Sequence, residues 1–278
     1  TLFQYFTGCL IAGLVCLTAF PSWAAIVYVG SQVGSTVGVT TEQSINFALT
    51  GGTDAAPLAG DFVVVTWCVA NNNGSDLTFS VKNTSGGTDY TLIGSEQRAN
   101  DDHDANMRVA YRVMPGTPET AVVLSETVTG GTGAITDSGA YHIFVLRNVH
   151  ATPLAQAAVQ GATANTRIVN PGDITITATG SFTLVSGCSA QATGGTFTSS
   201  DLTDFRATTQ SDTFDINIGA GYLTGISGAT SPATFGAGGT DSTQDSYAWT
   251  IVEFAAAADA APSSGANNCG ALMLLGVG

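Results

Sequence analysis

The stretch that decides the fold is Phe62-Val63-Val64-Val65-Thr66-Trp67-Cys68-Val69-Ala70. Its β-branched and aromatic residues favour an extended strand rather than a helix. Successive side chains of a strand point to opposite faces, so this run is apolar on both faces of the pleat. The pattern is typical of a central strand that is covered on both sides.

The same style of sequence continues from Ile26 to Phe254. Short runs of Val, Ile, Thr, Phe and Tyr alternate with turn signals such as Asn72-Asn73-Gly74 and Pro115-Gly116, and no helical periodicity is sustained. We therefore expect an all-β fold, an antiparallel two-sheet β-sandwich that is jelly-roll-like. The expected strands are 26–29, 43–49, 61–70, 77–82, 90–96, 106–112, 120–127, 139–147, 174–178, 182–190, 204–209, 215–223 and 247–254.

Composition narrows the class of protein. Hydrophobic residues make up 44% of the 278 residues and charged residues only 10%, which excludes a disordered polyelectrolyte. The 21 acidic residues outnumber the 7 basic ones, for a net charge of −14. Because nucleic-acid binding depends on Lys and Arg neutralising phosphates, this balance argues against DNA or RNA as a partner.

Both ends of the chain differ from the middle, which suggests three parts: 1–25, 26–254 and 255–278. Residues 9–20 form an apolar run followed by small residues at Ser22 and Ala24. A secretory signal, an apolar assembly arm or membrane-touching arm, and a start-site artefact are three open interpretations. Residues 255–261 are Ala-rich, and one or two helical turns are expected there. The apolar tail after them is expected to pack on its own domain or on a neighbour.

Five cysteines are widely spaced without any CxxC pair, so zinc-site spacing is absent. Cys68 and Cys188 each lie in a strand-like run. Buried free thiols are the favoured interpretation, because small buried cysteines are common in protein cores. A disulfide between the two is the alternative.

The densest polar cluster is Asn100-Asp101-Asp102-His103-Asp104. Oxygen ligands from Asp101, Asp102 and Asp104 make it a calcium candidate. A solvated loop between two strands is the competing interpretation, since the ligand spacing and the sharp glycine turn of calcium loops are missing. No other cofactor is expected.

Enzyme chemistry finds little support, and we expect no catalytic residues. His142 lies inside an apolar run and His150 at a strand end, with no G-x-S-x-G elbow. Paired carboxylates for glycoside hydrolysis would come from Glu96, Glu119, Glu126 and Glu253. For a glycan-binding face, Trp67 and Trp249 have the pattern of core residues, while Tyr90 and Tyr222 are better candidates for exposure.

Three segments resemble a β-sandwich module of tailed-phage virion proteins. Pro57-Leu-Ala-Gly-Asp-Phe-Val-Val-Val65 is similar to its "aGDlvvv" strand, and Arg108-Val-Ala-Tyr-Arg-Val-Met-Pro-Gly-Thr117 to its "ayrv-x-x-G-t" strand and turn. Ala140-Tyr-His-Ile-Phe-Val-Leu-Arg-Asn-Val149 with Thr152-Pro153-Leu154 is similar to its "vfRgv-x-x-tPl" segment. Segments 172–176 and 180–185 fit the strands that close the sandwich.

The resemblance implies a structural role in a virion, as capsid decoration, tail or fibre component. Its partners would be copies of itself and other virion structural proteins. The signal-like N-terminus departs from the family, whose members assemble in the cytoplasm. The alternative is a secreted bacterial cell-surface or carbohydrate-binding protein with a surface glycan as its partner.

Overall fold

A computed structural model describes the chain at residues 25–37, 42–71, 76–95, 97–98, 104–129, 138–154, 159–164, 174–176, 180–191, 197–210, 215–224, 228–230, 236–237 and 246–257. In these parts the regular elements are all strands, and every paired strand runs antiparallel to its neighbours. The predicted all-β, antiparallel sandwich is confirmed.

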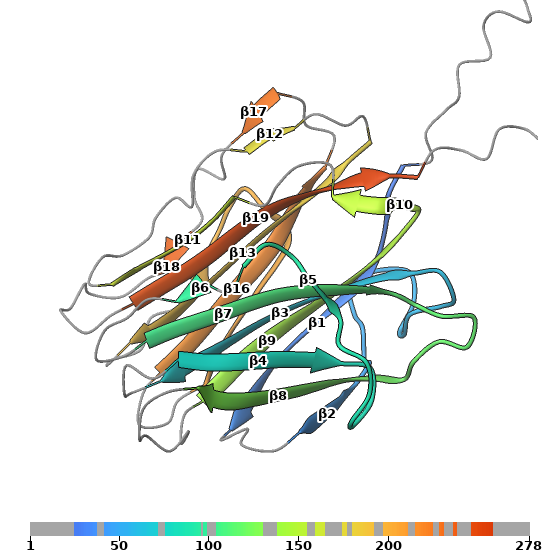
Figure 1. Cartoon of the computed structure of the whole chain (residues 1–278). Helices are drawn as coiled ribbons and strands as arrows, with labels where there is room; N and C mark the ends of the chain where they lie inside the picture. Colours follow the sequence, from blue (N-terminus) through green and yellow to red (C-terminus); the bar gives the residue numbers. More distant parts are fainter. Residues whose placement is uncertain are drawn as a thin grey trace, which may run out of the picture.

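The sandwich consists of two six-stranded sheets (Figure 1). The first, here the central sheet, has the order β1 (Val27–Val37), β9 (Ser138–Arg147), β3 (Phe62–Asn71), β7 (Asp104–Val113), β5 (Thr91–Leu92), with β6 (Gln97–Arg98) also on β7. The second sheet has the order β10 (Val149–Leu154), β19 (Ser246–Ala256), β13 (Phe182–Gln191), β16 (Asp215–Thr224), β15 (Thr203–Gln210), with β11 (Val159–Ala164) also on β19.

A third sheet covers the other face of the central sheet. The sequence did not predict this additional layer. It has the order β2 (Gln43–Asn46), β8 (Ala121–Thr129) and β4 (Asp76–Lys82). Figure 1 shows these strands as a separate layer beside β7, β3 and β9. Two short pairs complete the described strands: β12 (Ile174–Ile176) with β17 (Gly228–Thr230), and β14 (Phe197–Thr198) with β18 (Gly236–Ala237).

The two faces of β3 enter two different cores. Phe62, Val64 and Cys68 pack between the central and second sheets, among side chains of β9, β13, β16 and β19. Val63, Val65 and Trp67 point the other way, toward the third sheet and its Val122 and Leu124. All six of these β3 side chains are at most 1% exposed, which confirms the central strand. Burying one such side chain contributes about 1.5–3 kcal/mol.

A disulfide joins the two sheets of the sandwich through their middle strands. Cys68 of β3 is bonded to Cys188 of β13, with the two Cα atoms 6.2 Å apart. Both cysteines are fully buried, as expected, but the preference for free thiols is wrong. The physical reason lies in the strand pairing, which places both cysteines on the facing surfaces of the two sheets, where neither sequence run alone reveals the other.

The Ala-rich segment after Phe254 also differs from expectation. Ala255 and Ala256 continue strand β19 and do not begin a helical turn. Ala256 pairs with Val149 of β10 and is fully buried. Pairing with a neighbouring strand satisfies the backbone here, which outweighs the helix propensity of alanine.

A tight turn leads into β3. Asp61 N donates to Leu58 O at 3.1 Å, which closes the turn Leu58-Ala59-Gly60-Asp61. Gly60 has φ of +82°, the value that the third residue of a type II turn requires. The Asp61 carboxylate, which is buried, accepts a second bond from Leu58 N at 2.8 Å. Glycine at residue 60 therefore permits the turn that leads the chain into β3.

Arg147, at the end of β9, binds this same carboxylate. Its Nε lies 2.7 Å from Asp61 Oδ1 and its Nη2 lies 2.8 Å from Asp61 Oδ2, a bidentate ion pair. Arg147 also reaches Asp54 at 3.1 Å. The hydrogen bond to Asp61 raises the pKa of Arg147 above its ordinary value. The negative charge of Asp61 and the hydrogen bond and charge of Asp54 raise it further.

The next residue, Asn148, turns the chain from the central sheet into the second. Its φ of +63° lies in the left-handed region, which Asn tolerates better than most residues. β9 ends before it in the central sheet, and β10 begins after it in the second sheet. Asn148 is therefore the corner at which the chain passes from the central sheet into the second sheet.

A polar cluster closes the sandwich between β1 and β15. Asp204 of β15 accepts hydrogen bonds from the hydroxyls of Tyr28 and Ser31 of β1, the latter at 2.8 Å. Arg206 binds Asp204 at 3.1 Å and Thr50. Burial raises the pKa of Asp204, but the bonds from Arg206, Tyr28 and Ser31 outweigh it and hold the pKa below its usual value.

Removal of the disulfide by Cys68→Ala together with Cys188→Ala should lower the free energy of unfolding by about 2–5 kcal/mol. The bridge joins residues 120 positions apart, so it greatly restricts the unfolded chain. Urea denaturation followed by circular dichroism measures the loss. Wild-type protein in reductant should match the double variant, and equal stability of wild type with and without reductant would contradict the bridge.

Gly60→Ala should lower the free energy of unfolding by about 1–2 kcal/mol, because alanine is strained at positive φ. Gly116→Ala is the matched control: a Cβ at either position meets no atom within 4 Å, but only Gly60 has a positive φ. The control should be neutral or stabilising by up to about 1 kcal/mol. Equal thermal shifts for the two variants would show that the turn does not require glycine.

Candidate functional site

The calcium candidate falls largely outside the described residues. Asp101 and Asp102 lie outside them, and Asp104 begins β7 with its side chain not described. Within the described ranges, no group of three or more His, Cys, Asp or Glu side chains is arranged to hold a metal ion. Calcium binding by this segment stays a prediction.

The two described histidines lie in strands of different sheets and in different surroundings. His142 lies in strand β9, as its apolar sequence context indicates, and the structure shows that it is fully buried. His150 is in β10, where its Nδ1 accepts a hydrogen bond from Thr152 N at 2.9 Å. This Nδ1 also lies 3.1 Å from Thr152 O, so both of these contacts are with the backbone of Thr152.

The glutamates considered for glycoside hydrolysis are dispersed over different layers. Glu126 is in β8 of the third sheet, and Glu253 is in β19 of the second sheet, with the central sheet between them. Both are buried. Glu119 lies before β8, and Glu96 lies outside the described residues. The structure therefore does not bring Glu126 and Glu253 together.

The aromatic candidates are buried or, for Trp249, partly buried. Trp67 is fully buried, as predicted, and Trp249 packs on a cluster that contains Tyr247 and Ile251. The expectation that Tyr90 and Tyr222 are exposed is wrong. Tyr90 is 3% exposed, and its hydroxyl donates to Glu119 at 3.3 Å. Tyr222 is 9% exposed and stacks on Phe182, with ring centroids 4.5 Å apart.

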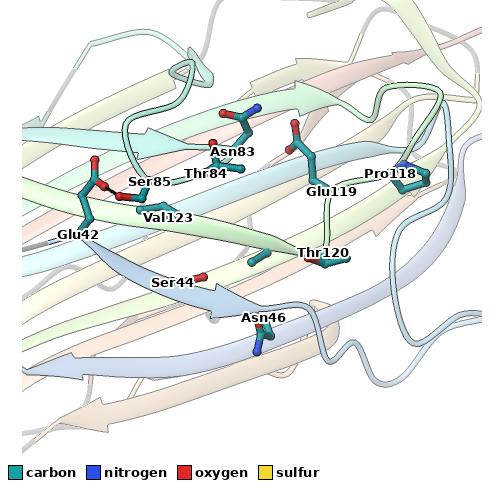
Figure 2. Close-up of a pocket in the computed structure, with 11 residues that line it drawn as sticks. Glu42, Ser44, Asn46, Asn83, Thr84, Ser85, Pro118, Glu119, Thr120 and Val123 are labelled. Carbon is teal, nitrogen blue, oxygen red and sulfur yellow. Dashed lines mark hydrogen bonds between the residues drawn. The ribbon is translucent and has the colours of Figure 1, made fainter.

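A groove of about 390 Å³, lined by both polar and apolar side chains, lies on the outer side of the third sheet. Figure 2 shows Glu42 beside Ser85, and Glu119 and Pro118 in another part of the lining. Ser44 and Asn46 come from β2, Ala121 and Val123 from β8, and Asn83, Thr84 and Ser85 from the turn after β4. Two backbone hydrogen bonds hold the turn over the sheet. Tyr90 N donates to Val81 O, and Asn83 N donates to Thr88 O.

Glu42 holds that turn in place. Its carboxylate accepts a hydrogen bond from the Ser85 hydroxyl, from Gly86 N at 3.0 Å, and from Lys82 Nζ at 3.0 Å. These hydrogen bonds lower the pKa of Glu42 to about 2, and the bond from Ser85 contributes most. Lys82 is the only lysine of the chain. The carboxylate is therefore ionised and already occupied by groups of its own chain.

Glu119 is held in a similar way. Its Oε1 lies 2.7 Å from Arg112 Nε, and its Oε2 accepts from Tyr90. The Arg112 guanidinium lies over the Tyr90 ring, 5.9 Å from its centroid. Burial, followed by the charge of Glu119, raises the pKa of Tyr90. Because both carboxylates have partners, the polar groups that the groove offers to a ligand are mainly hydroxyls and amides, which suit hydrogen bonding.

The amide proton resonance of Gly86 should titrate with a midpoint near pH 2, since it reports the protonation of Glu42. The lowered pKa means that these bonds stabilise the turn above about pH 4.5 and lose that effect as the pH falls toward 2. Two-dimensional NMR over this range measures the midpoint. Ser85→Ala should move it upward, Glu42→Gln should abolish it, and a wild-type midpoint near 4.5 would contradict the contacts.

The part of the chain that the structure describes contains no membrane-spanning helix. Comparison of the chain with protein-family models, with curated proteins and with solved structures finds no match.

Proposed function

We propose that this protein is a non-enzymatic structural component of a phage-like virion, as capsid decoration or as part of a tail or fibre. It acts through assembly with copies of itself and with neighbouring virion proteins. The observation that carries the proposal is the meeting of the three phage-like segments at one corner of the fold.

The meeting is made by specific bonds. Gly60 and Asp61 of the first segment exchange backbone hydrogen bonds with Met114 of the second, at 3.0 and 2.8 Å. Arg147 of the third segment forms a bidentate ion pair with the Asp61 carboxylate. Asn148 occupies, at positive φ, the position of glycine in the "vfRgv" motif. Residues that carry the resemblance are thus bonded to one another, which supports a resemblance of structural units rather than of isolated strands.

The two ends of the described sandwich meet at the same corner. Asn148 Nδ2 donates to Ala25 O at 3.3 Å, and Ala257 N donates to Asn148 O at 2.7 Å. The terminal sequences 1–24 and 258–278, which contain the apolar runs, are joined to the sandwich at these points. This placement supports attachment to neighbouring subunits from one corner, with the rest of the body left free.

The proposal is tested on particles from the producing culture. The protein should co-purify with particles through a density gradient, in multiple copies per particle by quantitative mass spectrometry. Gold-labelled antibody should decorate one particle feature in electron microscopy. Recovery only in the particle-free fraction, as isolated monomers, would overturn the proposal.

A secreted or cell-surface glycan-binding protein is the second candidate. Two observations favour it: the buried disulfide, which is typical of oxidising compartments, and the hydroxyl- and amide-lined groove. A glycan array with wild type and the groove variant Asn46→Ala, against Ser35→Ala outside the groove, decides it. Binding that only Asn46→Ala weakens would favour this candidate; no binding by wild type would count against it.

A further inference from the structure

Four polar side chains lie together in the apolar core between the central and second sheets. They are Thr66, His142, Ser186 and Thr250, and each is at most 1% exposed. Thr66 pairs with His142 across β3 and β9, and Ser186 pairs with Thr250 across β13 and β19. We refer to these residues as the buried polar layer.

The two pairs occupy the same level of the sandwich. Thr66 and Ser186 each precede a bridged cysteine by two residues, so the disulfide fixes them opposite each other. Phe62 and Phe254 are in ring contact at 5.1 Å, and Phe254 pairs with Phe182. β3 and β13 therefore run in the same direction. Side chains at equal distances in sequence from the two bridged cysteines thus face each other across the core.

Apolar groups bound the buried polar layer on both sides. The disulfide lies beside it in one direction, and Phe144 and Tyr222 lie in the other, with ring centroids 6.4 Å apart. The His142 imidazole stacks on Phe144 at 4.3 Å between centroids. On the second sheet, Ser186 also pairs with Ala220 of β16, which lies at the same level as the buried polar layer.

The polar atoms of this layer make no hydrogen bond within the part of the chain that the structure describes. This holds for both ring nitrogens of His142 and for the hydroxyls of Thr66, Ser186 and Thr250. Buried polar groups without partners are costly and rare in proteins. A charge at His142 would be costlier still, because the surrounding core cannot solvate it.

The charged and titratable groups around His142 do not favour its protonation. Its pairing partners Thr66 and Val33 carry no charge. From β15, Arg206 opposes a positive charge and Asp204 favours one; Tyr222 of β16 is a neutral phenol. Burial, followed by the charge of Arg206, lowers the pKa of His142 to about 3.

We propose that the buried polar layer is an acid-sensitive element: His142 takes up a proton only when the packing of the two sheets opens, so acid favours the open state. An unfolded histidine titrates near pH 6.5, so the neutral imidazole stabilises the fold fully above that pH. As the pH falls below about 6.5, the unfolded chain binds a proton that the folded chain does not, and stability is lost.

The disulfide limits how far this weakening goes. It joins the sheets two residues away from Thr66 and Ser186, so the sheets stay linked while the layer is strained. We expect acid to loosen the oxidised protein reversibly and to unfold the reduced protein at a higher pH. Acid and reductant would then act together on one region of the core.

The experiment is urea unfolding of the full chain between pH 7.5 and 5. For wild type, the unfolding equilibrium constant should rise by a factor approaching ten for each pH unit below about 6, relative to His142→Phe. Phenylalanine keeps an aromatic ring in this position without a titrating group. His150→Gln, at the histidine of β10, is the matched control and should behave as wild type.

Equal pH dependence of wild type and His142→Phe would overturn the proposal. If that variant does not fold, NMR of the imidazole nitrogens in the wild-type protein decides instead. A neutral His142 ring down to pH 5 in the folded state supports the proposal, and titration near pH 6.5 refutes it. These outcomes do not depend on which of the two proposed functions holds.

Discussion

The fold depends on the burial of both faces of one strand. β3 carries Phe62, Val64 and Cys68 toward the second sheet and Val63, Val65 and Trp67 toward the third. Neither set can remain in water, so a layer must cover each face of the central sheet. The three-layer arrangement follows from this single constraint, and the Cys68–Cys188 bond then fixes the second sheet on the central one.

Polar side chains at the edges of the sandwich are well paired. Asp61 and Arg147 secure the corner between the sheets, while Asp204 and Arg206 close the opening between β1 and β15. Each charge there has a partner at hydrogen-bond distance. The buried polar layer differs, because His142 lies in the core without a bonding partner in the described part of the chain. We infer that these unpaired polar groups lower the stability of the sandwich core at this level.

The strands could be predicted well because their signals are local. β3, β9, β13 and β16 lie within a residue or two of the predicted limits, since alternating apolar runs end at turn residues. β10 and β11 were missed: Val149–Leu154 contains a proline, and Val159–Ala164 is mostly small and polar. The groove was missed as well, because Glu42, Ser44 and Glu119 meet only after β2 and β8 have paired.

The sequence by itself determined the all-β class, the position of the central strand and the burial of Trp67. These properties follow from hydrophobic pattern over a few neighbouring residues. Tertiary structure alone decided the third sheet, the Cys68–Cys188 bond, and the partners of Asp61 and Asp204. It also turned Tyr90 and Tyr222 inward. Each of these joins residues far apart in the chain, and their distance is set by how sheets stack, which no local pattern encodes.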